Sequence, residues 1–206
     1  MGSTMRLGYF GGSFDPPHLG HLAVAEAAGR AYSLGRVLFV PTGRQPLKPV
    51  GPSAPFSDRL AMTQLLCESQ PAANFEVSTL DAPLANAEPN YTVDALDRLH
   101  RQSPADEIFV LVGADAFLEL RRWRDPDRLI ELAEWIVVSR PGFALEQMDA
   151  LGLSAAQRSR IHALEGIAEP ASARLIREDL RAGSDCAGQL PPTVLAYIRA
   201  HHLYGT

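Results

Sequence analysis

Short apolar runs alternate along the chain with longer stretches that are rich in Ala, Leu and charged residues. The apolar runs have the length and composition of β-strands and lie at 6–10, 37–40, 108–112 and 135–138. A further strand is predicted at 75–80, where apolar and polar residues alternate. The longer stretches hold good helix formers without an internal proline and predict helices at 19–32, 57–69, 92–101, 172–181 and 192–200. Ser57 is the expected N-cap of the second of these helices.

The order of these elements predicts an α/β fold. Strand, helix and strand in repeated order favour a doubly wound, mostly parallel sheet with right-handed crossovers and helices on both faces. After Gly142 the pattern turns helical, so about 143–206 is predicted to be a mostly helical C-terminal part. Ligands of such sheets bind beyond the carboxyl ends of the strands. The segments that follow 6–10, 108–112 and 135–138 are therefore the first places to search for a site.

Composition and charge narrow the class of protein. The 206 residues are 46% hydrophobic and 21% charged, which predicts one globular domain over 5–206, with residues 1–4 interpreted as an addition left by cloning. A formal net charge of -5 argues against a nucleic-acid partner, and no apolar run reaches membrane-span length. Cys67 and Cys186 stand alone, so we expect no disulfide or zinc site and a cytoplasmic setting. The oligomeric state stays open.

The loop after the first strand has the chemistry of a phosphate cradle. Gly11 and Gly12 let the backbone approach an oxyanion, and the following helix presents unpaired N–H groups and the positive end of its dipole. His18 and His21 are three residues apart, so both imidazoles lie on one face of the helix start. Rings in that place can stabilise charge on phosphoryl oxygens. The long loop that contains 43–48 is a second candidate substrate segment.

Two other interpretations of the histidines stay open at this point. A pair of histidines three residues apart is often a core or surface feature, or a pair of metal ligands. No further His/Cys cluster accompanies them, although Asp15 or Asp115 could approach in space.

The first loop also carries a longer signature. It reads GGSFDPPHLGH over 11–21, with no Lys-Ser or Lys-Thr after the glycines and no GxGxxG. It resembles the GxFDPxHxGH signature of the nucleotidylyltransferase superfamily. Nearly the whole chain resembles one family within it, the bacterial nicotinate mononucleotide adenylyltransferases. Blocks similar to that family's follow in its order, namely Val112-Gly113-Ala114-Asp115, Trp123, Ser139-Arg140-Pro141-Gly142 and Tyr197 to Tyr204.

The resemblance implies a Rossmann-like fold and a reaction of NAD biosynthesis. Magnesium-bound ATP and nicotinate mononucleotide would give nicotinate adenine dinucleotide and pyrophosphate, with Mg²⁺ held mainly by the ATP phosphates and with no protein metal ligand. The implied catalytic residues are His18 and His21. The implied ATP-binding residues are Gly11, Gly12, Ser13, Phe14, His18, Gly20, His21, Gly113, Asp115, Ser172 and Arg177. The implied mononucleotide-binding residues are Lys48, Thr92, Trp123 and Arg124.

The chain departs from the family's pattern in three places. The Ser-Ser-Thr-x-x-Arg motif appears as Ser-Ala-Arg-Leu-Ile-Arg over 172–177, so two hydroxyl donors are absent. Leu47 stands where a histidine is usual, and Asn90 stands where a serine precedes Tyr91.

Alternative functions therefore stay open. One is a related transferase acting on nicotinamide mononucleotide or phosphopantetheine, or using CTP. Another is a nucleotide-binding module without turnover, and the sequence leaves the choice between acid and amide mononucleotides undecided.

Overall fold

A single parallel sheet organises the chain. The computed structural model describes residues 4–47, 50–139, 145–167 and 171–206. In this described part, six parallel strands lie in the order β3-β2-β1-β4-β5-β6. Their bounds are β1 Arg6–Gly12, β2 Arg36–Pro41, β3 Phe75–Val77, β4 Glu107–Gly113, β5 Glu134–Val138 and β6 Ile161–Leu164. This order is that of a doubly wound sheet, so the predicted fold class is confirmed.

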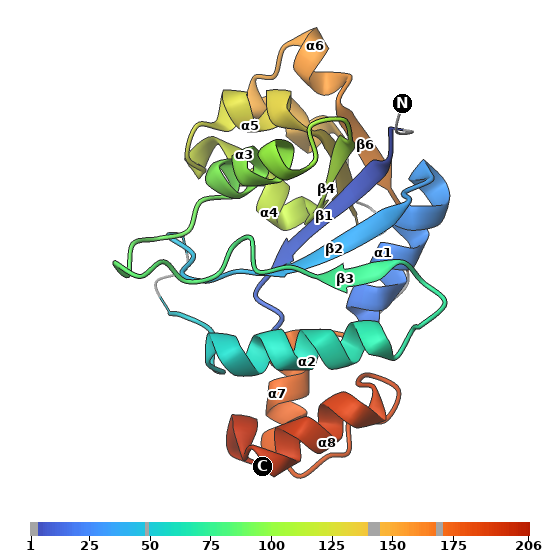
Figure 1. Ribbon diagram of the computed structural model, residues 1–206, viewed down its shortest axis with the longest axis vertical. Coiled ribbons are helices and arrows are strands. Elements are labelled where there is room, and N and C mark those ends of the chain that lie inside the picture. Colours follow the sequence, from blue (N-terminus) through green and yellow to red (C-terminus); the bar gives the residue numbers. More distant parts are fainter. Residues whose placement is uncertain (1–3, 48–49, 140–144, 168–170) are drawn as a thin grey trace.

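Helices cover both faces of the sheet (Figure 1). The α-helices are α1 Leu19–Tyr32, α2 Phe56–Glu68, α3 Thr92–Gln102, α4 Ala114–Leu118, α5 Pro126–Leu132, α6 Ala155–Arg158, α7 Ala173–Arg181 and α8 Pro192–Ala200. Short 3₁₀ helices occupy Leu120–Arg122, Leu145–Leu151 and Leu203–Gly205. Among the described helices, none combines the length and the apolar character needed to cross a bilayer.

The side chains of β1 alternate between the two faces of the sheet and contribute to two layers of the core. Leu7 and Tyr9 pack with α3, α4 and α5, whereas Phe10 packs with α1, α2, α7 and α8. Successive side chains of a strand point to opposite faces of the sheet, so each layer receives every second residue. Figure 1 shows α3 and α5 on one side of the sheet and α2, α7 and α8 on the other.

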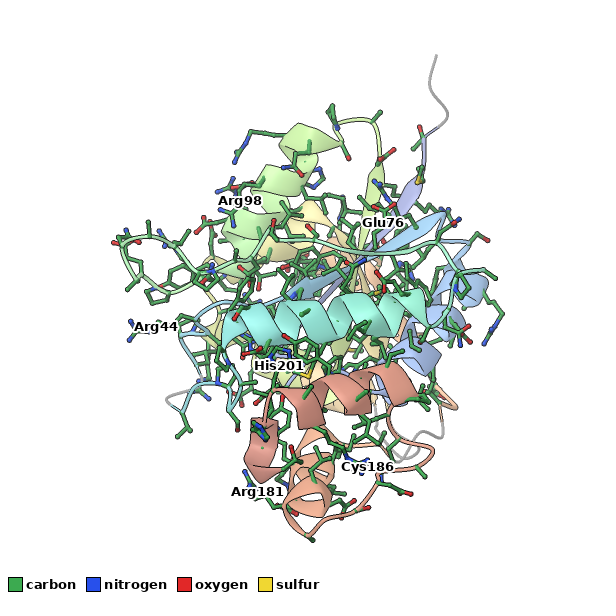
Figure 2. All side chains as sticks on the ribbon, turned by 60° about the horizontal axis from the view of Figure 1, so that its bottom comes forward. Arg44, Glu76, Arg98, Arg181, Cys186 and His201 are labelled. Atoms are coloured by element: carbon green, nitrogen blue, oxygen red, sulfur yellow. The ribbon has the colours of Figure 1, made fainter. Side chains whose placement is uncertain are left out.

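The last two helices reach back to the start of the chain. Figure 2 shows α8 lying alongside α2, and the two helices are in contact. Tyr197 on α8 donates from its hydroxyl to Oδ1 of Asp58 on α2 at 2.9 Å. The C-terminal part therefore covers the face of the sheet that also holds α1.

The structure differs from the sequence prediction at several elements, and it contains α4 and α5, which were not predicted. A strand, β6, lies within the region predicted to be mostly helical, because its four residues pair with β5 and extend the sheet by one edge strand. The strand predicted over 75–80 ends at Val77, because the chain then enters a turn closed by the N–H of Ala82 and the carbonyl of Thr79 at 3.0 Å. Helix α2 is preceded by Pro55, so Ser57 lies inside the helix.

Candidate active site

A cavity lies at the point where the sheet reverses its winding. β1 and β4 are neighbours, and the helices that follow them, α1 and α4, cover opposite faces. Their carboxyl ends leave a crevice of the kind in which doubly wound sheets bind ligands. The cavity has a volume of about 370 Å³, and its lining includes the predicted site residues Gly11, Gly12, Ser13, Thr92, Gly113, Trp123 and Arg124.

One end of the cavity is aromatic. The ring of Trp123 packs edge to face against Trp135, with 6.2 Å between ring centroids. The guanidinium of Arg124 lies 4.6 Å from the centroid of the Tyr91 ring. Thr92 is the first residue of α3, where backbone N–H groups lack helical acceptors and favour an anion. This end combines an aromatic face with donors for a carboxylate.

The two predicted histidines form a close pair with tilted rings at the start of α1. Their ring centroids are 3.8 Å apart, and the backbone N–H of His18 donates to Nδ1 of His21 at 3.1 Å. Burial lowers the pKa of His18 to about 4. Burial, together with the neighbouring His18, also lowers the pKa of His21 well below its ordinary range. At neutral pH both imidazoles of the ligand-free pair are therefore uncharged.

The histidine pair lies beside the aromatic start of the loop. The Phe14 ring is 4.9 Å from the His21 ring between centroids, and Phe14 has a left-handed backbone with φ 47°. Gly20 is buried in the first turn of α1. Neither imidazole belongs to the cavity lining, which reaches the loop at Ser13.

Asp15 connects the loop to distant segments of the chain. Its carboxylate accepts from the N–H of Ser53 at 2.6 Å, the N–H of Ala54 at 3.0 Å and the hydroxyl of Tyr204 at 2.8 Å. Nη1 of Arg177 lies 3.7 Å from the same carboxylate and donates to the Asp15 carbonyl at 2.5 Å. The Asp15 carboxylate thus ties the loop to the segment at 53–54 and to the C-terminal turn.

Arg59 is hydrogen-bonded to the loop and to two other segments of the chain. This buried residue of α2 donates to the carbonyls of Ser13 at 2.6 Å, Thr42 at 2.8 Å and Ala54 at 3.2 Å. Buried backbone carbonyls need hydrogen-bond donors. The Arg59 guanidinium supplies these donors to carbonyls in three segments of the chain. The sequence did not single out Arg59, although its spacing from the buried Met62 and Leu66 places it on the core stripe of α2.

A second polar network lies in the wall of the cavity. Asn90 accepts from the N–H of Arg44 at 2.9 Å and donates to the carbonyl of Ala82 at 2.8 Å, so it joins two loops. Asp81 is buried in the cavity wall with Oδ1 lacking a hydrogen-bond partner. Burial raises the pKa of Asp81 to about 7. The sequence analysis identified Asn90 only as a departure from the family pattern, and it did not identify Asp81.

Comparisons with known proteins identify the family. A model of the cytidylyltransferase-like family matches residues 9–179. A protein of Solibacter usitatus (strain Ellin6076) named "Probable nicotinate-nucleotide adenylyltransferase" is 41% identical over 201 residues, which cover 97% of this chain and 100% of that protein. A protein of the same name from Roseiflexus sp. (strain RS-1) is 40% identical over 202 residues, with coverage of 98% and 99%. This chain belongs to the nicotinate-nucleotide adenylyltransferase family.

A solved structure shares the fold of this nicotinate-nucleotide adenylyltransferase family member. The Plasmodium falciparum nicotinic acid mononucleotide adenylyltransferase complexed with NaAD matches it with a TM-score of 0.75 and 16% identity, covering 97% of each chain. At that identity the likeness shows the fold. The family resemblance drawn from the motif at 11–21 is thereby confirmed by the relatives of higher identity.

The remaining predicted residues of the nicotinate-nucleotide adenylyltransferase pattern lie apart from the cavity lining. Asp115 is exposed in the first turn of α4. Ser172 precedes α7 without capping it through its side chain, and Arg177 on α7 reaches the loop through Asp15. Lys48 lies outside the described residues, and so does 140–142 of the Ser-Arg-Pro-Gly block.

Proposed function

We propose that this chain is an enzyme that transfers the adenylyl group of ATP to nicotinate mononucleotide, giving nicotinate adenine dinucleotide and pyrophosphate for NAD biosynthesis. The observation that carries the proposal is the cavity in which the glycine loop of β1 meets Trp123 and Thr92. The full-length relatives named for this activity support it. So does the distant relative whose structure holds NaAD.

The reaction is a direct displacement at the α-phosphorus of ATP. A phosphate oxygen of the mononucleotide forms the new O–P bond, and the bond to the leaving pyrophosphate breaks. The attacking oxygen is already an anion at neutral pH, so the protein needs no general base. Catalysis then consists of aligning two anionic substrates and stabilising charge on the leaving group.

The pyridine nucleotide is proposed to occupy the aromatic end of the cavity. Trp123 would stack on the electron-poor pyridine ring. The hydroxyl of Thr92 and the N–H groups at the start of α3 would receive its carboxylate, with Arg124 nearby. The family pattern also assigns Lys48 to the binding of this substrate. This arrangement favours the acid over the amide, since an amide brings no negative charge to the helix start.

ATP is proposed to lie over the glycine loop. Gly11, Gly12 and Ser13 would let its phosphates approach the backbone, next to Phe14 and Gly20. His18 and His21 would donate hydrogen bonds to the phosphates. On the other side, Gly113 and Asp115 would approach the ribose, since a carboxylate accepts from hydroxyl groups. Arg177 and Ser172 would face the departing pyrophosphate.

Magnesium is proposed to enter as part of the ATP complex. Phosphate oxygens are good ligands for this hard cation, and bound there it neutralises charge on the triphosphate. The chain's own contribution is then the donors of the loop and of Arg177.

A pyrophosphate-release assay tests the proposed function. The unaltered protein should release pyrophosphate rapidly with ATP and nicotinate mononucleotide, and far more slowly when nicotinamide mononucleotide replaces the acid. CTP in place of ATP, and phosphopantetheine in place of the mononucleotide, test the related transferases. Saturable ATP binding without release under every pairing would instead identify a nucleotide-binding module.

A further inference from the structure

A tyrosine close to the C-terminus is hydrogen-bonded to the phosphate loop. Tyr204 lies in the 3₁₀ turn after α8, where His202 and Tyr204 both have a left-handed backbone, with φ 51° and 60°. This turn directs the Tyr204 side chain inward, where it is 8% exposed. Its hydroxyl donates to Oδ1 of Asp15 at 2.8 Å, across 189 residues of sequence.

Asp15 is well placed to transmit this contact. It lies two residues after Ser13, which lines the cavity, and three residues before His18. Its carboxylate also holds the N–H groups of Ser53 and Ala54. A hydrogen bond from a hydroxyl to a buried carboxylate is stronger than one between neutral groups. The Tyr204 hydroxyl therefore helps to fix the loop between the cavity and the histidines.

We infer that Tyr204 is a positioning residue for ATP, acting through Asp15 on the shape of the phosphate loop. The inference rests on the proposed function for the identity of the nucleotide. It assigns Tyr204 no contact with substrate. Asp15 makes no described hydrogen bond with Thr92 or Trp123, so loss of the Tyr204 hydroxyl should weaken ATP binding and spare the mononucleotide.

The chain offers a matched control on the neighbouring helix. Tyr197 donates its hydroxyl to Oδ1 of Asp58 at 2.9 Å, a bond of the same chemistry and nearly the same length. That bond joins α8 to α2 and does not involve the loop. Tyr204→Phe and Tyr197→Phe therefore remove equivalent hydroxyls from the same end of the chain, and only the first removal alters the support of Asp15.

Steady-state kinetics of both variants test the inference. Tyr204→Phe should raise KM for ATP about five- to tenfold and leave KM for nicotinate mononucleotide within about twofold. The rise in KM for ATP is smaller than the full effect of losing a hydrogen bond to a charged group, because Tyr204 acts on ATP only through Asp15. Tyr197→Phe should leave both values near those of the unaltered protein. Equal rises in both KM values, or an unchanged KM for ATP, would refute the positioning role.

A measurement on the unaltered protein keeps the test independent of how the variants fold. Coupling between two sites is reciprocal, so ATP should slow hydrogen exchange in the peptide 201–206, and nicotinate mononucleotide alone should not. A hydrogen-exchange rate in this peptide that is the same with and without ATP would overturn the inference. Failure of the proposed function has a different signature, because it removes pyrophosphate release with the mononucleotide and leaves the exchange response to ATP intact.

Discussion

The backbone N–H of His18 donates to Nδ1 of His21 at 3.1 Å. Because Nδ1 accepts, a neutral His21 must carry its proton on Nε2. The contact therefore fixes the tautomer and leaves an N–H donor on the far side of the ring. The His18 ring packs against the His21 ring in a tilted arrangement, with 3.8 Å between centroids.

Substitutions at His21 should distinguish the roles of its two ring nitrogens. His21→Asn keeps an acceptor in the place of Nδ1 and loses the donor at Nε2. We expect both His21→Asn and His21→Ala to lower kcat by about 10²- to 10³-fold, the usual effect of removing one donor to a developing oxyanion. His21→Asn should unfold at nearly the temperature of the unaltered protein. Near-normal turnover in a folded His21→Asn would contradict the role.

Trp123 is expected to recognise the mononucleotide. Trp123→Ala should raise KM for nicotinate mononucleotide about tenfold, since stacking of an aromatic face on a cationic ring is worth about 1 to 2 kcal/mol. KM for ATP should change little, because the glycine loop lies at the other end of the cavity. Trp123→Phe serves as the control, because it retains an aromatic face and should recover most of the affinity. An alanine variant that loses ATP affinity instead would place the ring elsewhere.

Asp81 should give the fold a distinctive pH dependence. Its pKa is raised by burial to about 7, opposed by Arg98 and Asn90 and reinforced by Asp94. Tyr9 also faces it, and its own pKa is raised by burial and by the Asp81 charge. The folded state then binds a proton that the unfolded state releases near pH 3.8, so stability falls as the pH rises from there to about 7.

Asp81→Asn tests this dependence, because the amide cannot ionise. The stability gained by the variant over the unaltered protein should be larger at pH 8 than at pH 5, by about 2 to 3 kcal/mol at about 1.4 kcal/mol per pH unit. Urea unfolding at the two pH values measures the difference. A gain that is equal at both would mean that Asp81 titrates in the ordinary range. Arg98, labelled on α3 in Figure 2, is the neighbouring cation whose removal should raise the pKa further.

Gly43 is required by the close approach of two loops. A Cβ added there would lie 2.3 Å from Oδ1 of Asn90 and 2.8 Å from the backbone nitrogen of Pro83. Gly43→Ala should therefore lower the free energy of unfolding by about 1 to 3 kcal/mol. Gly29→Ala is the control, because nothing lies within 4 Å of its added Cβ and alanine favours a helix by up to about 1 kcal/mol. Equal effects at both glycines would contradict the steric argument.

Much of the fold could be predicted because local signals mark its elements. The predicted bounds 19–32 and 192–200 coincide with α1 and α8, and each stretch has helix formers between clear boundaries. β6 escaped prediction because it has four residues and no long apolar run, and its pairing with β5 determines its conformation. β3 was overextended because periodicity does not reveal the turn after Val77.

The candidate site also contains residues that the sequence predicts and residues that it does not. Residues that follow strand ends, such as Gly12 and Gly113, could be placed at one crevice because parallel strands share their carboxyl edge. Asp15, Arg59 and Tyr204 support that crevice through contacts between distant segments. No local pattern pairs Tyr204 with Asp15. Arg59 left one usable signal, a charged residue on the apolar stripe of a helix.

The paired imidazoles at the start of α1 also couple nucleotide association to acidity. Burial keeps their pKa values low in the free protein. A nearby triphosphate favours the charged form of His18, whereas His21 stays neutral while its Nδ1 accepts from the His18 N–H. Association should then draw protons from the medium, so the measured heat will vary with the ionisation enthalpy of the buffer. By the same linkage, we expect mild acidification to lower the Kd of the protein for ATP.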